Sequence, residues 1–190
     1  RLHANARSLF ARADQNIDGV YEVFCTVDGG QPNRLNPALP AGRSVQFFGI
    51  SPDSTRVVYI ADQDTDNVNE LYIVPIGGGA VTKLSGTMTA GGGVSAFGFT
   101  PDGSRVLYLA NQDLVDATEV YSVLPTGGSV VKLNQPFSSG RSVVQSVISP
   151  DSARLVYVAD QGTDEVFEMY SVPVAGGAAV RLNATLPTGG

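Results

Sequence analysis

Residues 51–84 read SPDSTRVVYIADQDTDNVNELYIVPIGGGAVTKL, and most of the chain consists of further copies of this stretch. Its Pro52 returns as Pro101 and Pro150, so the copies are 49 residues apart (101 − 52 = 49; 150 − 101 = 49). A period of about 40 to 50 residues with several short strands is typical of a β-propeller blade, whereas helical solenoids need long segments of 3.6-residue periodicity. The sequence therefore predicts an all-β propeller segment of about four 49-residue, four-stranded antiparallel blades.

The second copy predicts the order of strands in a blade. Residues 45–50 are apolar and aromatic and are expected to form the innermost strand, which Pro52 ends because proline cannot donate to a ladder. Residues 56–61 and 71–75 are β-branched and aromatic runs, typical of strands that are covered on both faces. Glycines 77 and 78 favour a hairpin turn into an outer edge strand at 80–84.

Aligning the copies gives blades at about 1–43, 44–92, 93–141 and 142–190, all in one propeller segment. In the first of them, residues 8–13 match the strand at 56–61, and no innermost strand precedes them. We expect such a blade to be completed from elsewhere, and the segment to be half of a larger ring. Two chains would close the ring as a homodimer, or further blades of a longer parent chain would do so.

Composition and charge exclude several classes of partner. The net charge is −6, and the 12 Lys and Arg residues are spread along the repeats, which disfavours nucleic acid and anionic membrane surfaces. No apolar run approaches the roughly 18 residues of a membrane span. The single cysteine, Cys25, allows no internal disulfide and occupies an apolar strand position, so we expect it to be buried.

Acidic residues recur after the second strand of each blade and supply most of the candidate ligand-face residues. The start of a calcium loop is suggested by Asp62, Asp64 and Asp66, but Asn67 and Ile73 stand where an EF-hand needs Gly and Glu, so that pattern fails. We predict Asx-type turns and solvated acids here, no metal site and no cofactor, and keep calcium at these three residues as the alternative. The candidate acids are Asp62, Asp64, Asp66, Glu70, Asp113, Glu119, Asp160 and Glu168.

Arg43 and Arg141 hold the same place in two connectors between blades, and Gly92 holds it in the third. We expect these connectors to share a face with the acidic loops, where the arginines would bind a peptide carboxylate or another anionic group. The alternative is that each arginine pairs with an aspartate of a neighbouring blade.

Catalytic patterns are missing from the sequence. The only histidine is His3, near the start of the chain, which disfavours Ser-His-Asp and Cys-His arrangements. No G-x-S-x-G motif is present, and one His with one Cys cannot form a zinc site. The acids recur in every blade, which favours a role in the fold, since a catalytic pair is needed only once. The sequence therefore predicts a protein that is not an enzyme.

The repeated residues also resemble a known family. Ser51-Pro52-Asp53, followed by Arg56-Val57-Val58-Tyr59 and by Asn69-Glu70-Leu71-Tyr72, is similar to the WD-like β-propeller repeats of the TolB family, and the pattern covers essentially the whole chain. The resemblance implies a bacterial, exported, protein-binding propeller of the periplasm or cell envelope. The chain departs from the family by having fewer than six blades and no second domain.

Three functions follow as hypotheses. The first is a non-enzymatic exported scaffold that binds a protein or peptide partner. The second is the gating or substrate-selecting propeller of a larger hydrolase of the prolyl-oligopeptidase type. The third is a structural or adhesive array, in which blades of successive molecules complete one another.

Overall fold

The computed structural model describes residues 8–184 and 186, and within them every regular element is a β-strand. The strands form four separate antiparallel sheets, each following the chain in simple meander order. This confirms the predicted all-β fold with its repeated blades. Within the described part, no helix is long and apolar enough to cross a membrane.

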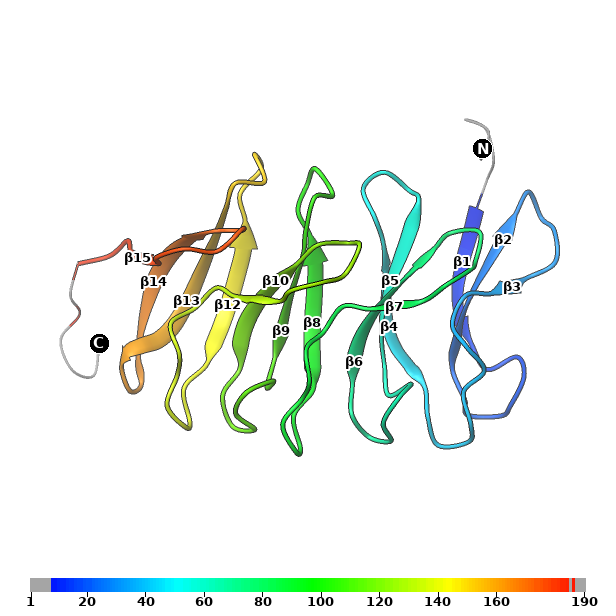
Figure 1. The fold of residues 1–190 in the computed structure, drawn as a ribbon, viewed down its shortest axis with the longest axis horizontal. Coiled ribbons are helices and arrows are strands. Elements are labelled where there is room, and N and C mark those ends of the chain that lie inside the picture. Colours follow the sequence, from blue (N-terminus) through cyan, green and yellow to red (C-terminus); the bar gives the residue numbers. More distant parts are fainter. Residues whose placement is uncertain (1–7, 185, 187–190) are drawn as a thin grey trace. The chain divides into compact units, whose positions relative to one another are not determined.

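The chain divides into two compact units, Arg1–Lys83 and Leu84–Gly190. Each unit contains two neighbouring sheets, labelled in Figure 1. The division falls between the second and third sheets, in the connector that carries Gly92 in place of an arginine.

The first unit holds a three-stranded and a four-stranded sheet. The first sheet has no described strand beyond β1 at its inner edge, whereas the second sheet has β4 there. Their strands are β1 (Ser8–Ala13), β2 (Glu22–Val27), β3 (Asn33–Arg34), β4 (Val45–Ile50), β5 (Arg56–Ala61), β6 (Glu70–Pro75) and β7 (Thr82–Lys83).

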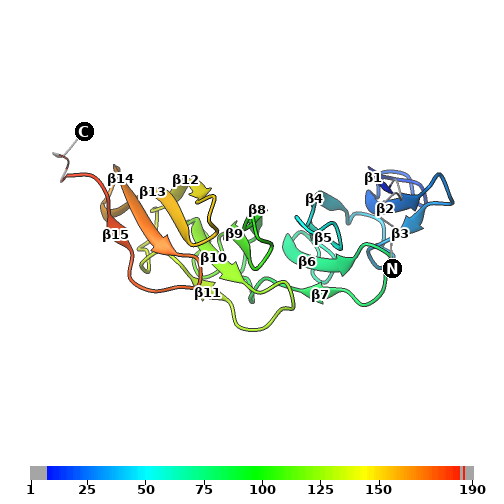
Figure 2. The ribbon, with the colours of Figure 1, turned by 90° about the horizontal axis from the view of Figure 1, so that it is seen from above.

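The second unit holds two four-stranded sheets, in which the strands run from inner to outer edge in chain order (Figure 2). Its strands are β8 (Val94–Phe99), β9 (Val106–Ala110), β10 (Glu119–Val123), β11 (Val131–Lys132), β12 (Val143–Ile148), β13 (Arg154–Thr163), β14 (Val166–Pro173) and β15 (Val180–Arg181). The strands β13 and β14 are longer than their equivalents because Thr163 pairs with Val166 across the turn.

The cores lie between neighbouring sheets because the two middle strands of each sheet bear apolar side chains on both faces. In the first unit, Val57 and Tyr59 of β5 pack against Val23 and Cys25 of β2. In the second unit, Leu155 and Tyr157 of β13 are buried in one cluster with Leu107 and Val120. Burying these apolar surfaces provides most of the free energy that holds adjacent sheets together.

The sharp turn between the first and second strands of a blade is fixed by its aspartate. Asp53 Oδ1 accepts hydrogen bonds from the Ser51 hydroxyl at 2.6 Å and from the Thr55 amide at 3.1 Å. Asp102 and Asp151 accept the equivalent amide bonds two residues on, at 2.9 and 3.0 Å. These are the Asx turns expected after each Ser/Thr-Pro-Asp motif.

Candidate functional site

The repeated glutamates, which the sequence placed among the exposed acids of the ligand face, are buried instead. Glu70, Glu119 and Glu168 begin or lie within the third strand of their blades, and each is at most 5% exposed. A ligand at the surface therefore does not reach them. Each of them needs polar partners that offset its loss of solvation.

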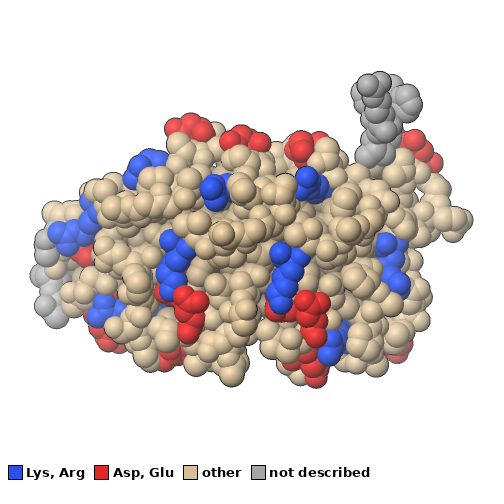
Figure 3. Space-filling view, in the orientation of Figure 1, with Lys and Arg blue, Asp and Glu red and all other residues tan. Residues whose placement is uncertain are grey.

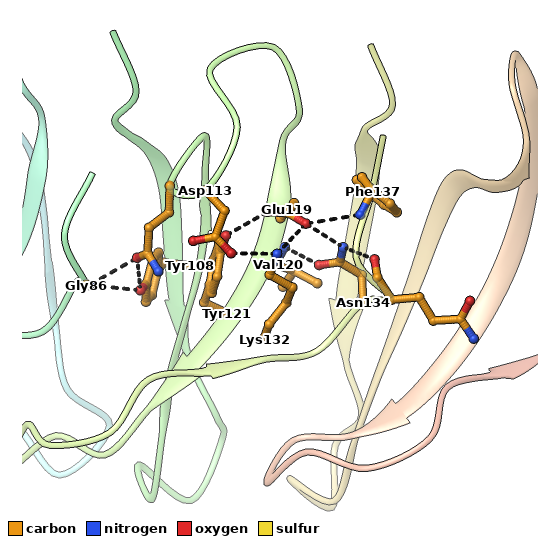
Figure 4. A network of polar contacts seen from close by, with 11 residues as sticks. Gly86, Tyr108, Asp113, Glu119, Val120, Tyr121, Lys132, Asn134 and Phe137 are labelled. Carbon is orange, nitrogen blue, oxygen red and sulfur yellow. Dashed lines mark hydrogen bonds and ion pairs between the residues drawn. The ribbon is translucent and has the colours of Figure 1, made fainter. Parts of the chain in front are cut away.

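Glu119 shows how a buried carboxylate is satisfied (Figure 4). Its Oε2 accepts the Tyr121 hydroxyl at 2.8 Å, and its Oε1 accepts Lys132 Nζ at 2.6 Å. Oε1 also lies 3.4 Å from two donors, Asn134 Nδ2 and the Phe137 amide. The carboxylate thus ties together the third strand, the outer strand and the connector to the next sheet, as a buried charge must to offset its desolvation.

The same network recurs in the other blades with small changes. Lys83 bonds to Glu70, Arg181 bonds to Glu168 at 2.8 Å, and Arg34 pairs with Glu22 at 3.2 Å. The sequence signal for this network is the spacing of the charges. A Lys or Arg follows 13 residues after Glu70, Glu119 and Glu168 and 12 residues after Glu22, and this spacing could have been interpreted as a buried pair.

Two further aspartates of the candidate set are also largely buried. Asp62 Oδ1 accepts the Ser44 amide at 2.7 Å, and Asp160 Oδ1 accepts the Ser142 amide at 2.8 Å. Their carboxylates therefore hold the connector that leads into the innermost strand, and not the local Asx turn that the sequence suggested.

Arg43 and Arg141 lie in these same connectors; Arg43 bonds to the loop after β5, and Arg141 bonds to the end of β13. Arg43 Nη1 donates to the Gln63 carbonyl and Arg141 Nη1 to the Gln161 carbonyl, both at 2.8 Å. Arg43 Nε lies 4.0 Å from Asp66, in a partly exposed pair. Both arginines are half-buried.

The connector with Gly92 is built differently. Its Thr89 amide donates to the Gln112 carbonyl at 2.8 Å, and a Cβ placed on Gly92 would lie 1.9 Å from the Asn111 carbonyl oxygen. The backbone thus passes where a side chain would be, which explains why an arginine is not found there.

Only Asp64, Asp66 and Asp113 of the candidate acids have exposed side chains, and each of them has a cationic partner, which for Asp66 is Arg43. Lys83 Nζ lies 3.6 Å from Asp64, and Lys132 Nζ lies 2.6 Å from Asp113. Within residues 8–184 and 186, no three His, Cys, Asp or Glu side chains are grouped as a metal site requires. The geometry gives the calcium alternative no support.

The groups considered for catalysis are placed as follows. His3 lies outside the described residues. Cys25 is buried on β2 as predicted, and burial raises the pKa of its thiol. A thiol that is buried and protonated is a poor nucleophile.

Each unit has a groove that described residues line. In the first unit, a polar groove of about 580 Å³ runs between the outer strand of the first sheet and the second sheet, and Arg34, Asp64 and Lys83 line it. Figure 3 shows that Lys and Arg side chains on the visible face stand apart, several with an acid beside them. The cations of this groove are paired with Glu22, Glu70 and Asp64.

In the second unit, an apolar groove of about 400 Å³ lies between the inner strands β8 and β12. Phe97, Leu109, Val144 and Ile148 line it, together with smaller residues such as Ala96. This groove was not predicted from the sequence. Its signal was that strand 143–148 carries apolar residues on both faces although it lies at an edge.

Comparison with solved structures supports a propeller fold. The chain is similar to a putative TolB from Agrobacterium tumefaciens, with a TM-score of 0.57 and 18% identity over 92% of this chain and 59% of that one. It is similar to TolB from Acinetobacter baumannii, with a TM-score of 0.54 and 17% identity over 90% of this chain and 39% of that one. A puromycin-hydrolysing peptidase from Mycobacterium tuberculosis gives a TM-score of 0.59 and 17% identity over 94% of this chain and 30% of that one.

These likenesses show a TolB-like propeller fold. The chain spans less than two thirds of the length of each of the three similar proteins. No protein-family model and no curated protein sequence matches the chain.

Proposed function

We propose that the protein is a non-enzymatic propeller module that binds an extended segment of a protein partner. The observation that carries this proposal is the apolar groove between β8 and β12, whose volume of about 400 Å³ suits one or two apolar side chains. Val144 lines the groove and is largely exposed, so an inserted side chain would bury apolar surface that now faces water.

The negative charge of the chain favours a partner segment with basic residues. The chain carries a net charge of −6, and the loops of the second unit expose Asp116, Asp164 and Glu165. A segment that joins an apolar anchor to flanking Lys or Arg would be attracted by this field and selected by the groove.

The test is to pan a random peptide-phage library on the 190-residue chain and to measure the affinity of enriched peptides by fluorescence anisotropy. Val144→Glu places a charge in the groove and should weaken binding at least tenfold, since an unpaired charge opposes an apolar anchor. Leu124→Glu is the matched control, because Leu124 is also exposed in the same unit but does not line the groove. Equal loss in both variants, or peptides that ignore Val144→Glu, would refute the groove as the binding site.

A second candidate function is the substrate-selecting propeller of a larger hydrolase. The likeness to the Mycobacterium tuberculosis peptidase, of which this chain spans 30%, favours it. The sequence of the full reading frame tests it: a nucleophile elbow in a neighbouring domain would support a hydrolase, and its absence would leave the binding module.

We also propose that the protein is exported to the periplasm or beyond. The basis is the resemblance of its repeats to those of the TolB family, in a chain whose described part has no membrane-spanning helix. Fractionation of cells that express the native gene tests this, and recovery with the cytoplasmic marker would contradict it.

A further inference from the structure

The apolar groove of the second unit lies where the first unit has an aromatic side chain. In the first unit, Phe48 of β4 pairs with Tyr59 and packs against the core between the two sheets. The corresponding residue of the fourth sheet is Ser146, which pairs with Tyr157 in the same way (146 − 48 = 98). Ser146 is exposed and lines the groove. The inner strand β12 therefore lacks the ring that β4 contributes to the equivalent contact.

The opposite wall of the groove is also small at this level. Ala96 of β8 lines the groove and stands at the repeat position of Phe47 (96 − 47 = 49). Two residues further along β8, a Cβ added to Gly98 would lie 3.9 Å from Ile148 Cδ1. The two sheets thus come close at Gly98 and Ile148 and leave space between Ala96 and Ser146.

The lining of this space suits a flat apolar group. Leu109, Val120, Ile148 and Leu155 are among the residues that surround it. A phenyl or phenol ring is flat enough to lie between two neighbouring sheets and buries a large apolar area there. A smaller aliphatic side chain would leave a void beside it and lose dispersion contacts with the walls.

Acidic residues at one end of the groove favour basic neighbours for that ring. Ala110 at the end of β9 pairs with Val94, close to Ala96, and Ala159 of β13 pairs with Val143. The loops that follow these two strands therefore leave their sheets at the same end of the groove. Their exposed acids are Asp116, Asp164 and Glu165. A Lys or Arg next to the inserted ring would be attracted to them.

We propose that the groove binds a phenylalanine or tyrosine side chain of the partner segment, with Lys or Arg beside it, and that Ala96 and Ser146 set this preference through their small size. This proposal rests on the proposed function, because it specifies the side chain that the groove between β8 and β12 takes up. The inserted ring takes the place that Phe48 has in the first unit. The partner thus completes a contact that the first unit makes with its own residue.

The experiment titrates the 190-residue chain with two single-residue probes, N-acetyl-phenylalaninamide and N-acetyl-leucinamide, and follows the backbone amides by nitrogen-15 NMR. The phenylalanine probe should shift the amide signals of Ala96 and Ser146 in a saturable way. It should bind roughly three- to tenfold more tightly than the leucine probe, because its ring buries more apolar surface. Equal affinities of the two probes, or no saturable shift with the phenylalanine probe, would overturn the proposal.

Two variants fill the groove from the chain itself. Ser146→Phe supplies the ring that Phe48 supplies in the first unit, and Ala96→Phe fills the space from the opposite wall. Each should abolish saturable binding of the phenylalanine probe. The matched control is Val147→Phe, because Val147 follows Ser146 in β12, points to the other face and does not line the groove.

Circular dichroism verifies that each variant is folded, and Ser146→Phe should unfold at a urea concentration no lower than that of the parent. A folded Ser146→Phe variant that binds the probe as the parent does would overturn the proposal. Loss of binding in Val147→Phe would do the same, because it would place the site on the other face.

The peptides selected by phage panning separate this proposal from the proposed function. Peptides that are weakened by Val144→Glu but share no aromatic residue would support the binding module and overturn the aromatic preference. A groove that binds the phenylalanine probe while panning enriches no peptide would support the aromatic preference and refute the binding of an extended segment.

Discussion

Glu119 gives the sharpest test of how the blades are held together. Glu119→Gln keeps the shape of the side chain and an acceptor for Asn134 and Phe137, but it removes the charge that Lys132 meets at 2.6 Å. A hydrogen bond to a charged group contributes about 1.5–3 kcal/mol, so we expect the free energy of unfolding to fall by that amount. Glu119→Ala also strands the Tyr121 hydroxyl and should cost about 3–5 kcal/mol.

The assay is urea unfolding followed by tyrosine fluorescence and far-UV circular dichroism, because the chain has seven Tyr and no Trp. Asp113→Asn is the matched control: it removes the exposed partner of the same lysine, and we expect a loss of at most about 1 kcal/mol. In a cycle with Lys132→Met, the pair should show a coupling of about 0.5–3 kcal/mol.

The assigned role of Glu119 is refuted if Glu119→Gln unfolds at the same urea concentration as the parent, or if Asp113→Asn lowers the free energy of unfolding as much as Glu119→Gln. The first result would mean that the buried charge contributes little, and the second that the exposed partner of Lys132 contributes as much as the buried one.

Three further predictions concern the backbone, pH and the thiol. Gly92→Ala should lower the free energy of unfolding by about 1–3 kcal/mol, because the new Cβ would meet the Asn111 carbonyl. Gly77 has open space around it and no positive φ, so Gly77→Ala should be neutral or slightly stabilising in the same urea titration. Hydrogen bonds from Thr100 and Ser104 lower the pKa of Asp102 to about 2. Because the folded pKa lies below the unfolded value, the stabilisation exists above about pH 4 and is lost as the pH falls toward 2, and Asp102→Asn should flatten that slope of stability against pH. Cys25 should react with a thiol reagent only at the rate of unfolding, so fast labelling of the native protein would contradict its burial.

The repeat made much of the fold predictable. The expected strands 8–13, 45–50 and 56–61 match β1, β4 and β5, because β-branched runs and proline boundaries act locally. The outer strands proved shorter than expected, since β7 pairs with β6 only at Thr82 and Lys83.

The candidate site was less predictable because burial of a polar group depends on partners far along the chain. An acid that bonds to a cation 13 residues later looks the same in sequence as a solvated acid, as Glu119 shows. The apolar groove depends on how two inner strands are spaced, which no local pattern specifies.

The connectors that lead into the innermost strands differ in sequence from one blade to the next. Arg43 and Arg141 are 98 residues apart (141 − 43 = 98), and so are Asp62 and Asp160, while Gly92 and Asn111 replace both partners midway. The arginine and the aspartate are thus lost together, although they are far apart in sequence. The third blade therefore holds its connector by a backbone bond, from the Thr89 amide to the Gln112 carbonyl, where the second and fourth use side chains.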